Sequence, residues 1–278
     1  MAGLSCSIAA FTVGCHLTRK ATSPRTEPFA VNGLERLVHK PLMTVYKINP
    51  GGATYPPITL YEDGLVIGLQ PLEKDAAGPD WWVAHLTPHE LAEFRERFEA
   101  TDIDRVPSYI HLVEGLKDGV STRILFRMRD GWRSVSVYGM RDDGKAESYG
   151  MQGMDASSAP DEFIAAYRML KEFHPAGATP WKPELIEIEV RDMSGSHAPP
   201  FPWPREVPAP PEDATTPEKV ETEAYRHILP GIHRTTMRML ILRANHAFEF
   251  NGRKWWLSMR DLLPEEDYLR EVERQQYW

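Results

Sequence analysis

The sequence is poor in cysteine, and none lies in the body of the chain. Of its 278 residues only Cys6 and Cys15 are cysteine, and both fall close to the N-terminus. Everything after Cys15 therefore lacks a thiol. This absence excludes an internal disulfide, a cysteine nucleophile and a cysteine-bound zinc ion from that part of the chain.

Long apolar runs and an excess of positive charge are also missing. No run approaches the roughly 20 apolar residues that a helix needs to cross a bilayer. The net charge is -8 and the isoelectric point is near 5.7. Because binding to nucleic acid or to an anionic membrane surface needs clustered lysine and arginine, neither is expected as a partner. The hydrophobic content of 42% is nevertheless ordinary for a globular protein with a substantial core.

Motifs for catalysis and for cofactor binding are absent as well. The sequence contains no G-x-S-x-G, no P-loop and no G-x-G-x-x-G, so no catalytic residue and no cofactor is predicted. The densest histidine cluster is His85 with His89, but a helix cap at Thr87 would place His85 outside the helix. The two rings then share no face, and no metal site is predicted. An enzyme whose acids and histidines converge only in the fold remains an alternative.

The N-terminal segment has the pattern of a secretion signal. Leu4 to Val13 is a short run of small and apolar residues, suited to the core of such a signal. It ends at Thr12-Val13-Gly14-Cys15, which resembles a bacterial lipobox, in which the cysteine receives lipid. Thr12 stands where that pattern prefers leucine, and no lysine or arginine precedes the run. The alternative is a cytoplasmic N-terminus with incidental cysteines.

These features divide the chain into three parts. Residues 1–15 are predicted to be a lipoprotein signal with Cys15 as the site of lipid attachment. Residues 16–40 are polar and without period, which is typical of a flexible tether. Residues 41–278 are predicted to form a single domain.

Within this domain, three dipeptides between strand-like segments predict tight hairpins. They are Asp63-Gly64, Asp130-Gly131 and Asn251-Gly252. Two-residue loops of type I′ need positive φ at both central positions, which Asn or Asp followed by Gly tolerates. The hairpin at Asn251-Gly252 cannot be stable alone, so we expect it to dock on the main sheet.

Helices are expected between the hairpins. Thr87-Pro88-His89-Glu90 predicts a capping box, followed by a buried stripe. A second helix is expected to start at Ser158 and a third to lie near Met237. The apolar positions of the three are Leu91, Phe94 and Phe98; Phe163, Ala166, Tyr167 and Leu170; and Met237, Leu240, Ile241 and Ala244.

Together these elements predict an α+β fold. We expect an antiparallel sheet built from β-hairpins, with helices packed on one face and a further strand at residues 185–190. Residues 198–217 are rich in proline and are predicted to cross a surface as an extended segment.

Tryptophan supplies the candidate binding residues. Trp81-Trp82 and Trp255-Trp256 are doublets, and adjacent residues of a strand point to opposite faces. One ring of each doublet is therefore expected in the core and one outside, which makes Trp82 and Trp256 candidates for contact with a glycan or a protein. Trp203, in the proline-rich segment, is a third candidate. The competing interpretation is that all these rings are covered within the fold.

Several stretches of the body resemble an uncharacterised family of bacterial proteins, many of which carry lipoprotein leaders. They are PPITLYEDGLVI, VYGM, TPWKPELIEIEV, FPWP and RDLLPEE, and the resemblance covers roughly residues 40–266. It implies a location in the cell envelope and no particular activity. We therefore expect a non-enzymatic, lipid-anchored envelope protein that touches the membrane only through its anchor and binds another protein or a glycan. A cytoplasmic immunity-type or accessory partner-binding protein is the alternative.

Overall fold

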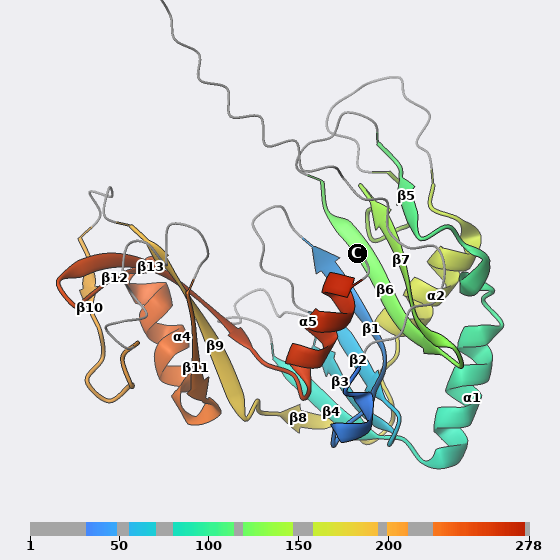
Figure 1. The fold of residues 1–278 in the computed structure, drawn as a ribbon, viewed down its shortest axis with the longest axis horizontal. Helices are drawn as coiled ribbons and strands as arrows, with labels where there is room; N and C mark the ends of the chain where they lie inside the picture. The colour runs from blue at the N-terminus through green and yellow to red at the C-terminus, as the bar shows by residue number, and fades with distance from the viewer. Residues whose placement is uncertain are drawn as a thin grey trace, which may run out of the picture.

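The computed structural model describes residues 32–48, 56–70, 80–113, 119–146, 158–193, 199–210 and 225–275. These residues form 13 strands in two mostly antiparallel sheets and four α-helices (Figure 1). The predicted mixture of helices with an antiparallel sheet is confirmed, whereas the expectation of one main sheet is wrong. The predicted signal at residues 1–15, with Cys15, lies outside the described residues.

The first sheet has eight strands in the order β5-β7-β6-β1-β2-β3-β4-β8. All neighbouring strands are antiparallel except β5 and β7. The strands are β1 (Pro41–Ile48), β2 (Ile58–Tyr61), β3 (Leu65–Leu69), β4 (Trp81–His85), β5 (Tyr109–His111), β6 (Ser121–Met128), β7 (Gly131–Tyr138) and β8 (Thr179–Trp181).

The second sheet has five strands in the order β10-β12-β13-β9-β11. They are β9 (Leu185–Asp192), β10 (Phe201–Pro202), β11 (Tyr225–Pro230), β12 (Ala247–Phe250) and β13 (Arg253–Asp261). The hairpin at Asn251-Gly252 belongs to this sheet and does not dock on the first one. The reason is that β13 pairs with β9 from Trp255 to Asp261, and the alternate β9 residues Ile186, Ile188 and Val190 are buried in a separate core.

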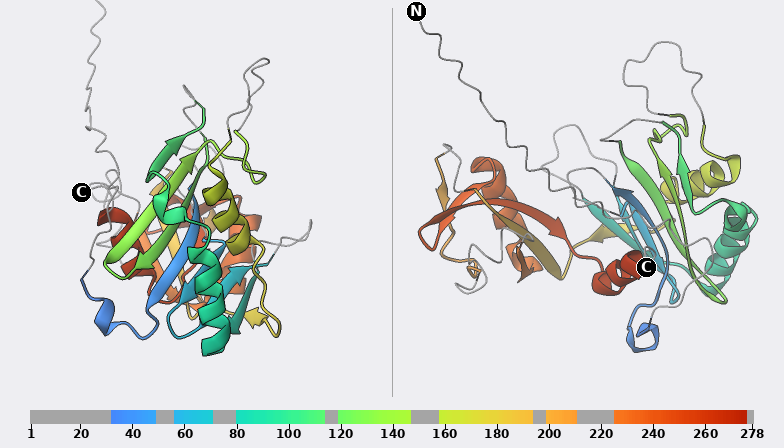
Figure 2. Two further views of the ribbon diagram at one scale, coloured as in Figure 1. Left: turned by 90° about the vertical axis from the view of Figure 1, so that its right-hand side faces the viewer. Right: turned by 45° about the horizontal axis from the view of Figure 1, so that its top comes forward.

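Helices cover both faces of the first sheet. The helices α1 (Pro88–Glu99) and α2 (Asp161–Lys171) pack in one core, and α5 (Glu266–Gln275) packs on the opposite face against Leu125 and Trp132 (Figure 2, left). The expectation that the helices pack on one face of the sheet is therefore not borne out. The helix α4 (Arg234–Arg243) covers the second sheet. Short 3-10 helices lie at η1 (Leu34–Arg36), η2 (Ile103–Arg105) and η4 (Gly231–His233).

The capping box predicted for α1 is present. Thr87 Oγ1 accepts a hydrogen bond from the Glu90 amide at 3.2 Å, and Glu90 Oε2 accepts one from the Thr87 amide at 2.8 Å. The predicted start of α2 is wrong by three residues. This helix begins at Asp161 after Pro160, while Ser158 instead bridges to Lys145 and caps nothing. The apolar positions predicted for both helices face the core.

The three predicted turn dipeptides all lie at hairpin ends, but only Asn251-Gly252 forms the expected turn, with φ of 52° and 68°. The second hairpin turns at Arg129 and Asp130, and Gly131 already pairs with Met128. The first has a three-residue loop with positive φ at Gly64 alone among its residues. A Cβ there would lie 2.4 Å from the Leu86 carbonyl oxygen, so this close approach requires glycine.

The end of the predicted tether is folded. Leu34 and Leu37 pack against the core on the α5 side, and the Val38 amide donates to Glu265 Oε1 at 3.0 Å. The expectation of a flexible segment is therefore wrong for residues 32–40, because these leucines cover part of the first sheet. No helix within the described part of the chain is long and apolar enough to cross a membrane.

Buried charges join the two sheets, which lie side by side (Figure 2, right). Asp261, at the end of β13, accepts hydrogen bonds from Arg234 Nε at 2.7 Å and from Arg234 Nη2 at 2.8 Å. It also accepts one from Trp81 Nε1 of the first sheet at 2.7 Å. Close by, Arg260 forms ion pairs of 3.0 Å with both Glu187 and Glu266. The junction is thus stabilised by ion pairs and hydrogen bonds between side chains that are buried or largely buried.

Candidate functional site

Trp82 is not an exposed contact residue. Its side chain packs in the core beneath α1 and α2, and its indole Nε1 donates to the Leu69 carbonyl at 3.3 Å. Trp81 points to the opposite face, as expected from strand alternation, but that face is covered too, and Trp81 packs there with Tyr61 and Leu263. The prediction for Trp82 is wrong because this sheet is covered on both faces.

Trp256 is partly exposed, and two side chains of its own sheet lie against its ring. The His246 ring stacks on it at 5.2 Å with an interplanar angle of 15°, and the Arg191 guanidinium lies 5.6 Å from the ring centre. His246 precedes β12 and Arg191 lies on β9, the two strands that flank β13. A sugar ring would therefore compete with these side chains for the indole.

Trp203 fastens the proline-rich segment to the second sheet. Its Nε1 donates to the Val207 carbonyl at 2.9 Å, and its ring lies 5.1 Å from that of Phe250. The extended residues Phe201 and Pro202 pair with β12 as the short strand β10. The crossing segment is thus present over residues 199–210, and the rest of its predicted length lies outside the described residues.

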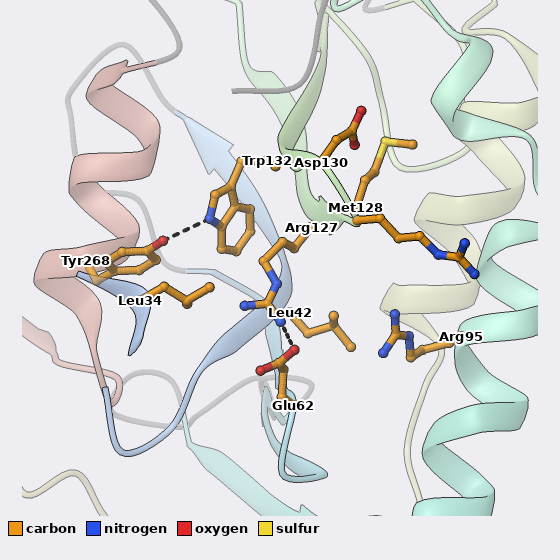
Figure 3. A pocket seen from close by; sticks show the side chains of 11 residues that line it. Leu34, Leu42, Glu62, Arg95, Arg127, Met128, Asp130, Trp132 and Tyr268 are labelled. Carbon is orange, nitrogen blue, oxygen red and sulfur yellow. Dashed lines mark hydrogen bonds and ion pairs between the residues drawn. The ribbon is translucent and has the colours of Figure 1, made fainter. Parts of the chain in front are cut away.

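The structure instead places a hollow at the end of the β6–β7 hairpin (Figure 3). Two adjoining cavities, with volumes of about 430 Å³ and about 630 Å³, form it. We call the pair the hairpin hollow. Both cavities are lined by Leu42, Arg95, Arg127, Met128, Arg129 and Asp130.

The two cavities differ in the rest of their walls. The smaller one reaches toward α5 and is completed by Leu34, Glu62, Gly131, Trp132 and Tyr268. The larger one reaches along α1 to η2 and is completed by Met43, Phe98, Glu99, Asp102, Ile103, Asp104 and Phe126. The hollow therefore runs past the hairpin from one side of the first sheet to the other.

Strand pairing determines to which face of the sheet each side chain of the hairpin points. Arg127 lies opposite Trp132 in the β6–β7 ladder, so both point to the α5 side. Met128 is the next residue and points to the α1 side. From α1, the core positions Phe94 and Phe98 fix the rotation of the helix, and Arg95 is directed toward the hairpin (Figure 3).

Arg127 is the most enclosed of the three arginines. Its side chain is 14% exposed and forms an ion pair with Glu62, at the end of β2 (Figure 3). Burial lowers the pKa of Arg127 below its usual value, and Tyr268 opposes this shift. Because a guanidinium loses its proton only far above neutral pH, Arg127 stays charged at neutral pH. The Glu62 carboxylate thus balances a partly desolvated cation.

Arg95 and Arg129 are exposed at the mouth of the hollow. Neither side chain forms an ion pair within the described ranges. A planar guanidinium can bind a carboxylate or a phosphate through two parallel hydrogen bonds. The mouth of the hollow can therefore accept an anionic group without first breaking an internal ion pair.

His85 and His89, the histidines considered as metal ligands, do not line the hollow. His85 is exposed at the end of β4, and His89 is exposed in the first turn of α1, with Nε2 at 3.4 Å from Glu93 Oε1. Considering the described residues only, no three His, Cys, Asp or Glu side chains are grouped so as to hold a metal ion.

The hollow could not be predicted from the sequence because the residues that line it are far apart in the chain. Glu62 lies in the loop after β2, Arg95 on α1 and Arg127 on β6. The one local signal is the Arg127-Met128-Arg129 run before a predicted turn, which places two guanidinium groups at one hairpin end. No model of a known protein family matches this chain, and no curated protein or solved structure shows significant similarity to it.

Proposed function

We propose that this chain is a non-enzymatic binding protein of the bacterial cell envelope, anchored by lipid at Cys15, and that it binds another protein or a glycan in the hairpin hollow. One observation carries the binding site: in a protein whose net charge is -8, Arg95, Arg127 and Arg129 line a single hollow and outnumber the acids, Glu62 and Asp130, in its smaller cavity. Such a concentration of guanidinium groups favours ligands with anionic groups.

The ion-paired carboxylates of the hollow also favour binding over catalysis. Glu62 neutralises Arg127, and Asp102 lies 3.4 Å from Arg105. A general acid or base must exchange protons with a substrate, whereas these groups act as charge partners. The enzyme alternative would have to use other acids of the hollow, such as Glu99, Asp104 or Asp130.

The binding site can be tested by photo-cross-linking in native cells. A photoreactive amino acid at Asp130, exposed at the rim of the hollow, should give a discrete adduct with the ligand. The same residue placed at Glu249, exposed on β12 of the second sheet, is the matched control. Adducts from Glu249 alone, or the same adducts from both positions, would move the binding site away from the hollow.

The anchor can be tested separately. We expect native protein to enter the detergent phase with Cys15 as its lipid-bearing N-terminus, and Cys15→Ala to stay in the aqueous phase. Each buried CH₂ contributes about 0.8 kcal/mol, so several acyl chains hold an acidic protein on a membrane. Mass spectrometry of the N-terminus is the measurement. An unmodified chain that retains Met1 would support the cytoplasmic alternative.

A further inference from the structure

We infer that the occupant of the hairpin hollow is an extended polypeptide segment that carries an acidic residue and, two or three residues away, a basic one. This inference rests on the proposed function and deepens it. It follows from the order of charges along the hollow, from the apolar floor between them, and from the lack of a free aromatic face.

The charges along the hollow are unevenly distributed. Both cavities are lined by the three arginines and by Asp130, whereas Glu99, Asp102 and Asp104 line only the cavity that reaches η2, so acids outnumber arginines there but not at the hairpin end. Asp102 has Arg105 as its ion-pair partner, while Glu99 and Asp104 are exposed and form no ion pair within the described residues. A complementary ligand therefore places a negative group at the hairpin and a positive group near η2.

The spacing of these charges fits an extended chain. Arg95 and Glu99 are four residues apart on α1, which corresponds to about 6 Å along the helix axis at 1.5 Å per residue. An extended peptide covers about 3.3 Å per residue. An acid and a base that are two or three positions apart in an extended peptide can therefore lie opposite Arg95 and Glu99, respectively.

Between the charged ends the walls are apolar. Met43, Phe126 and Met128 line the cavity on the α1 side. Methionine side chains are flexible and polarizable, so they adapt to apolar side chains of different shape. The segment should therefore carry an apolar residue between its acid and its base.

The aromatic groups favour a polypeptide over a glycan. Sugar rings are commonly bound on an exposed aromatic face. Trp132, the indole that lines the hollow, is buried and donates through Nε1 to the Tyr268 hydroxyl at 3.1 Å. A carboxylated glycan would satisfy the arginines but would leave Glu99 and Asp104 without a positive partner.

The test uses fluorescently labelled synthetic peptides and the purified protein. The probe has the core Glu-Leu-Leu-Lys, the comparison peptide has Gln-Leu-Leu-Gln, and oligogalacturonate is the carboxylated glycan. We expect the charged peptide to bind about tenfold or more tightly than the neutral one, because hydrogen bonds to charged groups are stronger than those between neutral groups.

Two arginines on one helix provide the matched variants. Arg95 and Arg97 are both exposed on α1, but only Arg95 lines the hollow. Arg95→Glu should weaken binding of the charged peptide about tenfold or more, and Arg97→Glu should change it by less than about twofold. Asp104→Lys should weaken the same peptide but leave an acid-only peptide unaffected. Circular dichroism melting of each variant verifies the fold.

Each other result overturns the inference. Equal affinity for the charged and neutral peptides, or equal losses from Arg95→Glu and Arg97→Glu, would remove the assigned recognition. Tight binding of oligogalacturonate that depends on Arg95 would keep the hollow as the binding site but replace the polypeptide with a glycan. If none of these probes binds but Asp130 still gives a discrete cross-link, the ligand class alone is overturned. If none of the probes binds and Asp130 gives no cross-link, the proposed function is overturned.

Discussion

Replacing Phe94 with alanine is expected to lower the free energy of unfolding by about 3–5 kcal/mol, the range for a large aromatic side chain removed from a core. The Phe94 side chain is 3% exposed and packs edge-on against Phe173, with ring centres 4.5 Å apart. It points from α1 into the core that the first sheet and α2 share. The cost therefore includes an unfilled cavity as well as lost burial.

The matched variant is Glu93→Ala, one position earlier on the same helix. Its side chain is 61% exposed, and its one ion pair, with His89, is exposed as well. We expect a change of less than about 0.5 kcal/mol, because exposed ion pairs contribute little. Urea midpoints measure both variants. Similar midpoints would show that the buried face of α1 is wrongly assigned.

The local parts of this fold could be predicted from the sequence. The capping box at Thr87 and the turn at Asn251-Gly252 depend on hydrogen bonds and φ values within a few residues. The same holds for the buried stripes of α1, α2 and α4, where the spacing of apolar residues determines which face meets the core.

The division into two sheets could not be predicted in this way. The hairpin at Asn251-Gly252 finds its partner in β9, which begins at Leu185. A hairpin turn predicts that two consecutive strands pair with each other. It does not indicate which distant strand pairs with them to extend the sheet. The same limitation applies to the tryptophan doublet of β4: Trp82 faces the core beneath α1 and α2, and the opposite face, which holds Trp81, is covered as well.

The candidate site has features that could be predicted from the sequence and features that depend on tertiary packing. Alternation along β6 and β7 places Arg127 and Trp132 on one face, and this could be read from a correct register. The pairing of Arg127 with Glu62 and the position of Arg95 depend on tertiary packing between β2, β6 and α1. Arginine-rich sites of this kind therefore become visible only in the folded chain.

The second large effect is expected at the junction of the two sheets. Asp261→Ala should lower the free energy of unfolding by about 3–5 kcal/mol, the usual cost of breaking a buried ion pair from one side. The Asp261 side chain is 3% exposed and that of Arg234 is 16% exposed. Removing the carboxylate leaves this guanidinium without its two charge-assisted hydrogen bonds and leaves Trp81 Nε1 without its acceptor.

A second substitution separates the loss of the ion pair from general damage. Replacing both partners of a buried ion pair with apolar groups is often nearly neutral, because no charge remains desolvated. Arg234→Met in the Asp261→Ala background should therefore recover part of the lost stability, with the Trp81 indole still lacking an acceptor. The exposed pair between Glu271 and Arg274, at 3.1 Å on α5, provides the control.

These three variants form one experiment in urea unfolding. Glu271→Ala should change the free energy of unfolding by no more than about 1 kcal/mol, since it breaks an ion pair that water already screens. If Asp261→Ala costs no more than that control, the junction is not held by these charges. If Arg234→Met deepens the loss, the guanidinium contributes through packing of its stem and not through its bond to Asp261. The expected pattern is a large loss that the second substitution partly reverses, because the penalty arises from removing one side of a buried ion pair.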